Sequence, residues 1–297
     1  MDFCDRYQDS EMQADVESLS LFIQFLSNKL ESPGAVMNYV SGVKTMHIIN
    51  DLSIRAFDDY LVKMMLRGIK VEKSHCPKKA APITPGILKD IYSTLDPDSS
   101  EDRTFWALFV MAFYLLARKS NLVPDTVAKF DQRKQLTRED IEVTDEGLMI
   151  TLKWSKTNQT GRKQVFPLIR NEGHVLCPVQ AYTRMVEAFP ARGSSPVFLL
   201  KRYGKVKTVT YRQYQDKIKK TIGAIGLDAS DYTSHSFRRG GATYAFQSGV
   251  SASQIKMLGD WQSDAYLEYI DCPIEERVKA GKLIREHINK QRELVDV

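Results

Sequence analysis

The fold is decided by one stretch and two shorter segments that follow it: Thr233-Ser234-His235-Ser236-Phe237-Arg238-Arg239-Gly240-Gly241-Ala242, then Gly259-Asp260-Trp261 and Tyr266-Leu267-Glu268-Tyr269. Ser234 or Ser236 can cap a helix at this point. His235 and Arg238 are three residues apart, so they can face the same way at a helix start. Two arginines in a first turn oppose the helix dipole, which favours anions there. The stretch therefore predicts a phosphate at this helix N-terminus, with a solvated arginine pair and a capping histidine as the alternative.

Composition and charge narrow the class of protein. The chain has 297 residues, enough for one large or two modest domains with real cores. Its content of 43% hydrophobic and 27% charged residues is typical of a soluble globular protein. The net charge of +5 favours anionic partners. That charge is uneven, because residues 1–20 are mainly acidic and residues 201–220 are strongly basic.

Several classes of site and location are not indicated by the sequence. The cysteines lie far apart, which predicts neither a zinc site nor a disulfide framework and favours a reducing compartment. No N-terminal signal is visible, and the longest apolar run, residues 105–117, is too short to span a bilayer. We therefore expect a soluble intracellular protein without a membrane partner. No phosphate-binding loop or metal-ligand motif is present, so we expect no cofactor and no metal.

Apolar spacing predicts two domains. Helices over about 12–30, 35–50 and 53–68 form an all-helical domain, residues 1–70. A polar, proline-bearing basic linker, residues 71–82, follows it. If both domains contact DNA, Lys78 and Lys79 in this linker can lie on phosphates, although a plain solvated tether is equally consistent with the sequence.

Residues 83–297 form the predicted second domain. A helix that is apolar almost all round runs from Ser100 to about Ala117 and leads directly into Arg118. Strands at 148–154 and 162–168 form a hairpin whose tip carries Lys156. An amphipathic tail helix, residues 273–294, packs either on its own domain or on a neighbouring subunit.

Residues 201–220 carry the most concentrated positive charge. Basic residues there alternate with tyrosines, and Asp216 is the single acid. Such interleaving is typical of a nucleic-acid-binding face, whereas a merely solvated helix mixes acids among its bases. We therefore expect DNA contacts from Arg202, Lys205, Lys207 and Arg212.

Six residues lie in the order found in one family, which the chain resembles: the tyrosine recombinases, or phage-integrase family. The residues are Arg118, Lys156, His235, Arg238, Trp261 and Tyr269. The resemblance covers both domains. It implies a mainly α fold with a small antiparallel β-sheet, made of an N-terminal helical core-binding (SAM-like) DNA-binding domain and a mixed α+β catalytic domain. The sequence of residues 117–122 and 235–242 most resembles that of recombinases of eukaryotic mobile elements, the DIRS, Ngaro and Crypton groups.

Two positions depart from the family pattern. Members often carry an acid three residues after the first arginine, where this chain has Asn121. The spacing from Trp261 to Tyr269 is also slightly shorter than in many members, which keeps Tyr266 as an alternative nucleophile. We prefer Tyr269 because it precedes Ile270, as the family tyrosine commonly precedes an apolar residue.

The resemblance implies a site-specific recombinase that cleaves DNA through a 3′-phosphotyrosyl intermediate, without metal or ATP. Arg118 and Arg238 clamp the phosphate, since paired guanidinium donors suit its geometry. His235 moves the tyrosine proton or holds the phosphate, and Lys156 protonates the departing 5′-oxygen. Trp261 donates its indole N–H to a phosphate oxygen. Arg239 is expected to contact the DNA backbone.

The same resemblance sets expectations about partners and location. The partner is double-stranded DNA, bound by a homo-oligomer, a synaptic tetramer that exchanges the tail helix between protomers. The expected role is integration or excision of a mobile element. The location is the nucleus in a eukaryotic host, and the cytoplasm or nucleoid otherwise. Two alternatives are a domesticated DNA-binding protein that no longer cleaves and a type IB topoisomerase.

Overall fold

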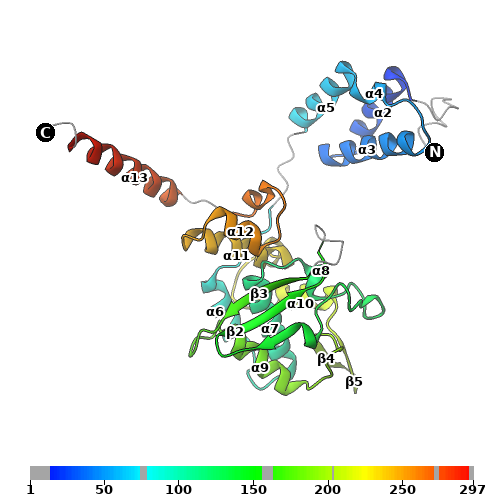
Figure 1. Ribbon diagram of the computed structural model, residues 1–297. Helices are drawn as coiled ribbons and strands as arrows, with labels where there is room; N and C mark the ends of the chain where they lie inside the picture. Colours follow the sequence, from blue (N-terminus) through cyan, green and yellow to red (C-terminus); the bar gives the residue numbers. More distant parts are fainter. Residues whose placement is uncertain (1–13, 74–78, 156–162, 203, 271–273, 294–297) are drawn as a thin grey trace. The chain divides into compact units, whose positions relative to one another are not determined.

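The computed structural model describes residues 14–73, 79–155, 163–202, 204–270 and 274–293 (Figure 1). The chain divides into two compact units, Met1–Lys78 and Lys79–Val297. Helices predominate, and the strands form a three-stranded and a two-stranded antiparallel sheet. The predicted mainly helical fold with a small antiparallel sheet is therefore confirmed. No helix in the described ranges has the length and apolar character needed to cross a bilayer.

The first unit is a bundle of helices α2 (Val16–Lys29), α3 (Pro33–Ile49), α4 (Arg55–Asp58) and α5 (Tyr60–Glu72). Its core is formed by apolar residues at helical spacing, including Leu19, Ile23, Val36, Val40 and Val62.

The predicted third helix is divided in two and ends later than predicted. The sequence predicts one helix over 53–68, but Asp59 has extended backbone and accepts a hydrogen bond from the backbone N–H of Leu61 at 2.8 Å, so α4 ends and α5 begins there. Helix α5 then continues to Glu72, so the first two residues of the predicted linker 71–82 are helical.

Helix α7 (Ser100–Tyr114) lies at the centre of the second unit. Every residue from Thr104 to Phe113 is buried, as its all-round apolar pattern predicts. Helix α9 (Pro178–Ala188), helix α11 (Ser234–Gln247) and strand β4 (Leu199–Arg202) pack against it. The helix is shorter than predicted, because Leu116 adopts a left-handed conformation with φ of 47° and ends it. Arg118 therefore follows a turn, in extended backbone.

The three-stranded sheet has the order β1 (Ile141–Val143), β2 (Gly147–Leu152), β3 (Gln164–Ile169). Ile150 of β2 lies between Ile141 and Phe166, which fixes the register through buried side chains. Strands β2 and β3 form the predicted hairpin. Its tip, with Lys156, lies outside the described residues. A second hairpin joins β4 to β5 (Lys205–Thr208).

The remaining elements complete the second unit. They are α6 (Pro85–Ser93), α8 (Lys119–Leu122), the short 3₁₀ helices η1 (Val127–Lys129), η2 (Arg138–Asp140), η3 (Ala229–Asp231) and η4 (Asp264–Glu268), α10 (Tyr211–Ala224), α12 (Ala252–Leu258) and α13 (Ile274–Glu293).

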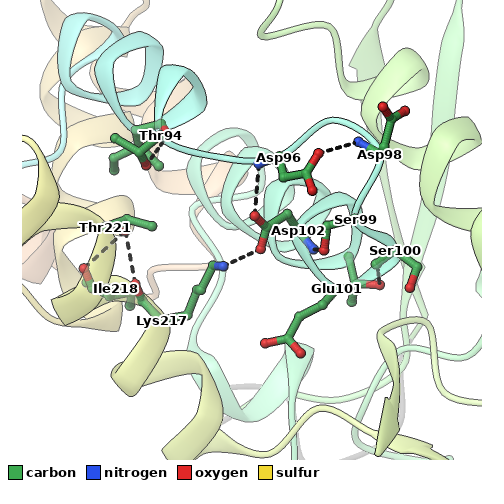
Figure 2. Close-up of polar contacts among 12 residues, drawn as sticks. Thr94, Asp96, Asp98, Ser99, Ser100, Glu101, Asp102, Lys217, Ile218 and Thr221 are labelled. Atoms are coloured by element: carbon green, nitrogen blue, oxygen red, sulfur yellow. Dashed lines mark hydrogen bonds and ion pairs between the residues drawn. The ribbon is translucent and has the colours of Figure 1, made fainter.

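The start of α7 is fixed by carboxylates rather than by packing alone (Figure 2). Ser99 caps the helix by accepting a hydrogen bond from the Asp102 backbone N–H at 3.3 Å. The Asp102 carboxylate accepts a hydrogen bond from the Asp96 backbone N–H at 2.9 Å and pairs with Lys217 of α10. This ion pair, with side chains only 10% and 15% exposed, ties α7 to α10.

Helix α11 lies unusually close to its neighbours. A Cβ atom on Gly240 would overlap the Ile83 carbonyl, and one on Gly241 would overlap the Phe113 carbonyl near the end of α7. The two glycines therefore allow the helix backbone to approach the core. This contact sets the position of Arg238, which lies two residues earlier on the same helix.

Candidate active site

Arg238 lies in the second turn of α11, not in the first turn as the sequence indicates. Thr233, rather than Ser234 or Ser236, is the N-cap, and the Ser236 hydroxyl accepts a hydrogen bond from the Thr233 backbone N–H at 2.9 Å to complete a capping box. The prediction of a first-turn arginine pair opposing the helix dipole is therefore wrong. The arginine is instead held by tertiary contacts.

The guanidinium group of Arg238 is almost completely buried, with 2% of the residue exposed. Its Nη2 donates to the Gly259 carbonyl at 2.8 Å, and Nη1 donates to the carbonyl of left-handed Leu116. The plane of Trp261 covers it, with 3.7 Å from Cζ to the ring centre. The third nitrogen, Nε, is buried and has no hydrogen-bond partner among the described residues.

Burial and a second cation make Arg238 an unusual arginine. Loss of hydration and the nearby Arg118 lower the pKa of Arg238 to about 9, against the opposing effects of Tyr269 and Asp260. An anion such as a phosphate would stabilise the charged form of this guanidinium group.

Arg118 approaches the same point from another element. It precedes α8, and its side chain is 19% exposed. The guanidinium Nη1 lies 3.7 Å from a carboxylate oxygen of Asp260. Lys119, the next residue, pairs with Asp125 at 3.2 Å, and its ammonium group lies 3.5 Å from the centre of the Tyr211 ring. The start of α10 is therefore beside this cluster of cations.

Tyr269 and Tyr266 have different surroundings, which bears on the choice of nucleophile. Tyr266 is buried, 7% exposed, with its ring centre 6.3 Å from that of Trp261. Tyr269 is half-buried; its ring centre lies 5.3 Å from Trp261 and 5.2 Å from the Arg238 guanidinium carbon. Tyr269 also lines an open cleft of about 310 Å³, which Tyr266 does not.

His235 also lines that cleft, in the first turn of α11. The other residues lining the cleft are Lys79, Ala80, Arg239, Glu268 and Tyr269. Loss of hydration lowers the pKa of His235, and the cations Arg238, Lys119 and Arg118 lower it further. The imidazole is therefore neutral near pH 7 and able to accept a proton.

Asp260 is a site residue that the sequence does not single out. It is 8% exposed, it has a left-handed φ of 51°, and it accepts a hydrogen bond from the Ser155 hydroxyl beyond the end of β2. Neither its pairing with Arg118 nor its contact with Ser155 has a signal in sequence spacing, because 142 and 105 residues separate these partners.

Asn121, the departure from the family pattern, has a defined structural role. The side chain is buried, and its amide donates to the Trp154 carbonyl at 2.5 Å. It thus fastens the end of β2 to α8. Lys156, two residues beyond Trp154, lies outside the described residues, so its predicted place at the site stays a prediction.

The structure brings together Arg118, His235, Arg238, Trp261 and Tyr269, as the sequence predicts. It shows the face of Trp261 against Arg238, a contact that the sequence does not predict; the expected indole donation to a phosphate stays a prediction. Among the described residues no His, Cys, Asp and Glu side chains group as a metal site would require.

The predicted DNA-contact residues divide into two groups. Lys79 and Arg239 line the cleft, where Lys79 pairs with Glu268 at 2.7 Å and Arg239 donates to the Glu268 carbonyl at 3.4 Å. Arg212 adjoins Tyr211 at the start of α10 and is 91% exposed at its side chain. Lys78 lies outside the described residues.

The second group lies on the β4–β5 hairpin, well away from α11 and α12 (Figure 1). Lys205 and Lys207 are exposed there, whereas Arg202 pairs with Glu101 at 3.2 Å. The structure therefore does not bring these residues to the cleft.

The chain is similar to known proteins in sequence and in fold. No protein-family model matches the chain. An integrase/recombinase XerD homologue from Selenomonas ruminantium is 24% identical over 261 residues, which cover 86% of this chain and 72% of that protein. The XerH site-specific recombinase, solved bound to a palindromic difH substrate, superposes with a TM-score of 0.61 at 12% identity, over 95% of this chain and 76% of that one.

Two further solved structures share the arrangement. The Tn1549 transposon integrase, in complex with circular intermediate DNA, has a TM-score of 0.57 at 15% identity, over 92% of this chain and 88% of its own. A lambda integrase dimer bound to a core site has a TM-score of 0.51 at 13% identity, over 87% and 80%. The chain has the tyrosine recombinase fold. The solved structures are similar to the chain in fold, and the XerD homologue is similar to it in sequence over most of its length.

Proposed function

We propose that the protein is a site-specific DNA recombinase that cleaves and rejoins strands through a 3′-phosphotyrosyl intermediate on Tyr269. One observation carries the proposal: the half-buried Tyr269 shares its cleft with neutral His235 and lies beside the buried Arg238 guanidinium. A phenol is a poor nucleophile at neutral pH, and it needs a proton acceptor and a polarised phosphate. His235 can accept the proton, and the Arg238 guanidinium can polarise a bound phosphate.

The residues in and beside the cleft have distinct tasks in this reaction. Arg118 and Arg238 bind the non-bridging oxygens of the scissile phosphate, with the buried Nε of Arg238 as an available donor. The Tyr269 oxygen attacks phosphorus while His235 accepts the phenol proton. The bond from phosphorus to the 5′-oxygen breaks, and Lys156 protonates that oxygen. A 5′-hydroxyl of another strand then reverses these steps and rejoins the DNA.

The decisive experiment traps the covalent intermediate. A nicked suicide substrate, incubated with the protein in EDTA, should give a complex that survives SDS, because the cleaved fragment diffuses away and prevents rejoining. Tyr269→Phe should abolish this complex, and Tyr266→Phe, the matched control, should keep it. If Tyr266→Phe abolishes the complex while Tyr269→Phe does not, the assignment of the nucleophile is wrong.

A second candidate is a DNA-binding protein that does not cleave. It is favoured by the engagement of Arg238, whose guanidinium already donates to two backbone carbonyls and stacks on Trp261. This candidate predicts DNA binding with no SDS-stable complex on any element-derived DNA. A type IB topoisomerase predicts instead that the protein relaxes supercoiled plasmid without a target sequence.

We further propose that the recombinase serves a mobile element of the DIRS, Ngaro or Crypton kind, and acts in the nucleus of a eukaryotic host. Two observations support this proposal: the sequence of residues 117–122 and 235–242, and the structural similarity to a transposon integrase. Inverted or split repeats in the DNA flanking this gene would supply candidate substrates. Their absence on both sides would count against the mobile-element role.

The tail helix supports an assembly of several protomers. Helix α13 exposes an apolar series along its length: Ile274, Val278, Leu283, Ile284 and Ile288. Exposed apolar series of this kind are typical of helices that bind a partner surface. We propose that α13 docks on a neighbouring protomer in a synaptic tetramer. A protein truncated after Cys272 should then bind DNA without forming the higher assembly, as measured by native gel shift.

A further inference from the structure

Asp260 occupies a costly position in the second unit. Its φ of 51° lies in the left-handed region, which most non-glycine residues avoid. Its carboxylate is buried beside the active-site arginines, although a buried charge needs compensation. Contacts between Asp260 and residues distant in the sequence offset both costs.

Three elements meet at the loop that contains Asp260. The Asp260 carboxylate pairs with Arg118 at 3.7 Å and accepts a hydrogen bond from Ser155 beyond strand β2. On either side of it, the Gly259 carbonyl and the Trp261 ring hold Arg238. The loop therefore contacts both arginines and the base of the β2–β3 hairpin.

The charge of Asp260 offsets a repulsion that the site creates. Arg118 is close enough to destabilise the charge of Arg238, and burial weakens the screening between the two guanidinium groups. A carboxylate beside Arg118 compensates for part of this repulsion when no phosphate is bound. The carboxylate also holds the Arg118 side chain towards the loop that contains Asp260. Without this partner the side chain would sample many rotamers.

We infer that Asp260 is a positioning residue, whose carboxylate holds Arg118 and the end of strand β2 in the arrangement that the reaction requires. The inference rests on the proposed recombinase function. It extends that function, because the residue acts through Arg118 and does not itself contact the DNA phosphate.

The substitution Asp260→Asn separates charge from shape. Asparagine has the size of aspartate, tolerates the left-handed region and can still accept a hydrogen bond from Ser155. Asp264→Asn is the matched control, because it removes the same charge from the same segment. The Asp264 side chain is 76% exposed and pairs with Lys256 at 3.0 Å, away from both arginines.

Single-turnover cleavage of the suicide substrate gives the first readout. Asp260→Asn should slow cleavage about 10- to 100-fold, because a misdirected clamp loses the near-attack geometry. DNA affinity should change little, thermal stability should fall because the buried arginines lose their compensating charge, and Asp264→Asn should cleave at the wild-type rate and keep the wild-type stability. A wild-type or faster rate for Asp260→Asn would overturn the inference.

A double-mutant cycle distinguishes positioning from general destabilisation. If Asp260 acts through Arg118, then Asp260→Asn should cause no further loss of rate in an Arg118→Ala background, measured over long incubations. A structural role independent of Arg118 would instead multiply the two losses. Multiplied losses would therefore contradict the inference.

A measurement without DNA keeps this inference separate from the proposed function. In ¹H–¹⁵N spectra, the Nε–H signal of Arg118, assigned with Arg118→Lys, should be resolved in the wild type and in Asp264→Asn. In Asp260→Asn it should merge with the signals of exposed arginines. An unchanged Arg118 signal refutes the positioning role. Failure of the wild type to form a covalent complex refutes the recombinase proposal, and the spectra still decide the role of Asp260.

Discussion

Two regions of the second unit look alike in sequence and differ in structure. The cleft at the start of α11 and the stretch 201–220 are both rich in positive charge. Beside the cleft, Arg118 and Arg238 come from distant segments and lie close together, largely buried. Along 201–220, the cations lie on a hairpin and a helix, where most are exposed.

The acidic residues that pair with these cations explain the difference between the two regions. Lys217 pairs with Asp102 inside the protein (Figure 2). Arg202 pairs with Glu101 at the surface. Arg212 lies 3.9 Å from Asp216 on its own helix. A count of basic residues along a segment ignores such partners. Spaced single residues that the fold gathers at one point carry more information about chemistry than a dense basic run.

The largest expected effect concerns Arg238. Arg238→Lys keeps the charge but cannot donate to both carbonyls and stack on Trp261 as a planar guanidinium does. Cleavage of the suicide substrate should fall about 10²- to 10³-fold, the usual cost of one lost donor to a developing charge. The exposed Arg212→Lys is the control and should cleave normally. Equal rates for both variants would remove the distinction between the two regions.

Lys217 tests the other side of the comparison through stability. Lys217→Met leaves the Asp102 carboxylate without its cation, and breaking a buried ion pair in this way costs about 3 kcal/mol. Urea denaturation should show this loss of unfolding free energy, while affinity for DNA stays unchanged. Lys219→Met, at an exposed position on the same helix, should alter neither quantity. A loss of DNA affinity without a loss of stability would instead identify Lys217 as a DNA contact.

Much of this arrangement could be predicted from the sequence. Apolar periodicity predicts the buried helix before Arg118, and alternation predicts the β2–β3 hairpin, since both patterns are local. The order of single residues predicts which side chains meet in the cleft. The family resemblance supplied that order, because residues 118 and 238 have no local relation.

What could not be predicted depends on contacts between distant segments. The left-handed Leu116, which ends α7 early, follows from its place against α11 rather than from a glycine or proline signal. The role of Asp260 requires Arg118 and Ser155 to be adjacent in space. The pairing of Lys217 with Asp102 likewise depends on α10 lying beside the start of α7. Such contacts are absent from any window of sequence.

The pH dependence of cleavage tests whether His235 belongs to the cleft chemistry. Burial and the neighbouring cations lower its pKa below the usual value of about 6.5, so it stays neutral to lower pH than in a peptide. Cleavage should fall by up to about tenfold per pH unit once the pH drops below that lowered pKa, because the protonated ring cannot accept the phenol proton. His235→Gln should be slow and should lose this acidic limb.

The same shift has a consequence for folding. Because the unfolded state binds the His235 proton more tightly, the free energy of unfolding should decrease as the pH falls through 6.5 towards the lowered folded pKa. The contribution is absent above both pKa values.

If His235→Gln keeps the full acidic limb of cleavage, the proton acceptor is another group.

The smallest effect is expected from the exposed lysines of the β4–β5 hairpin. If Lys205 and Lys207 each contact one phosphate, replacing either with glutamine should lower the slope of log affinity against log salt by about 1, with an affinity loss of a few-fold. Cleavage of bound DNA and stability should not change, since both side chains are exposed. An unchanged salt slope for the double variant would show that this hairpin is a solvated surface. In that case the DNA contacts of the second unit are confined to the cleft and the start of α10, and the basic composition of residues 201–220 does not report on DNA binding.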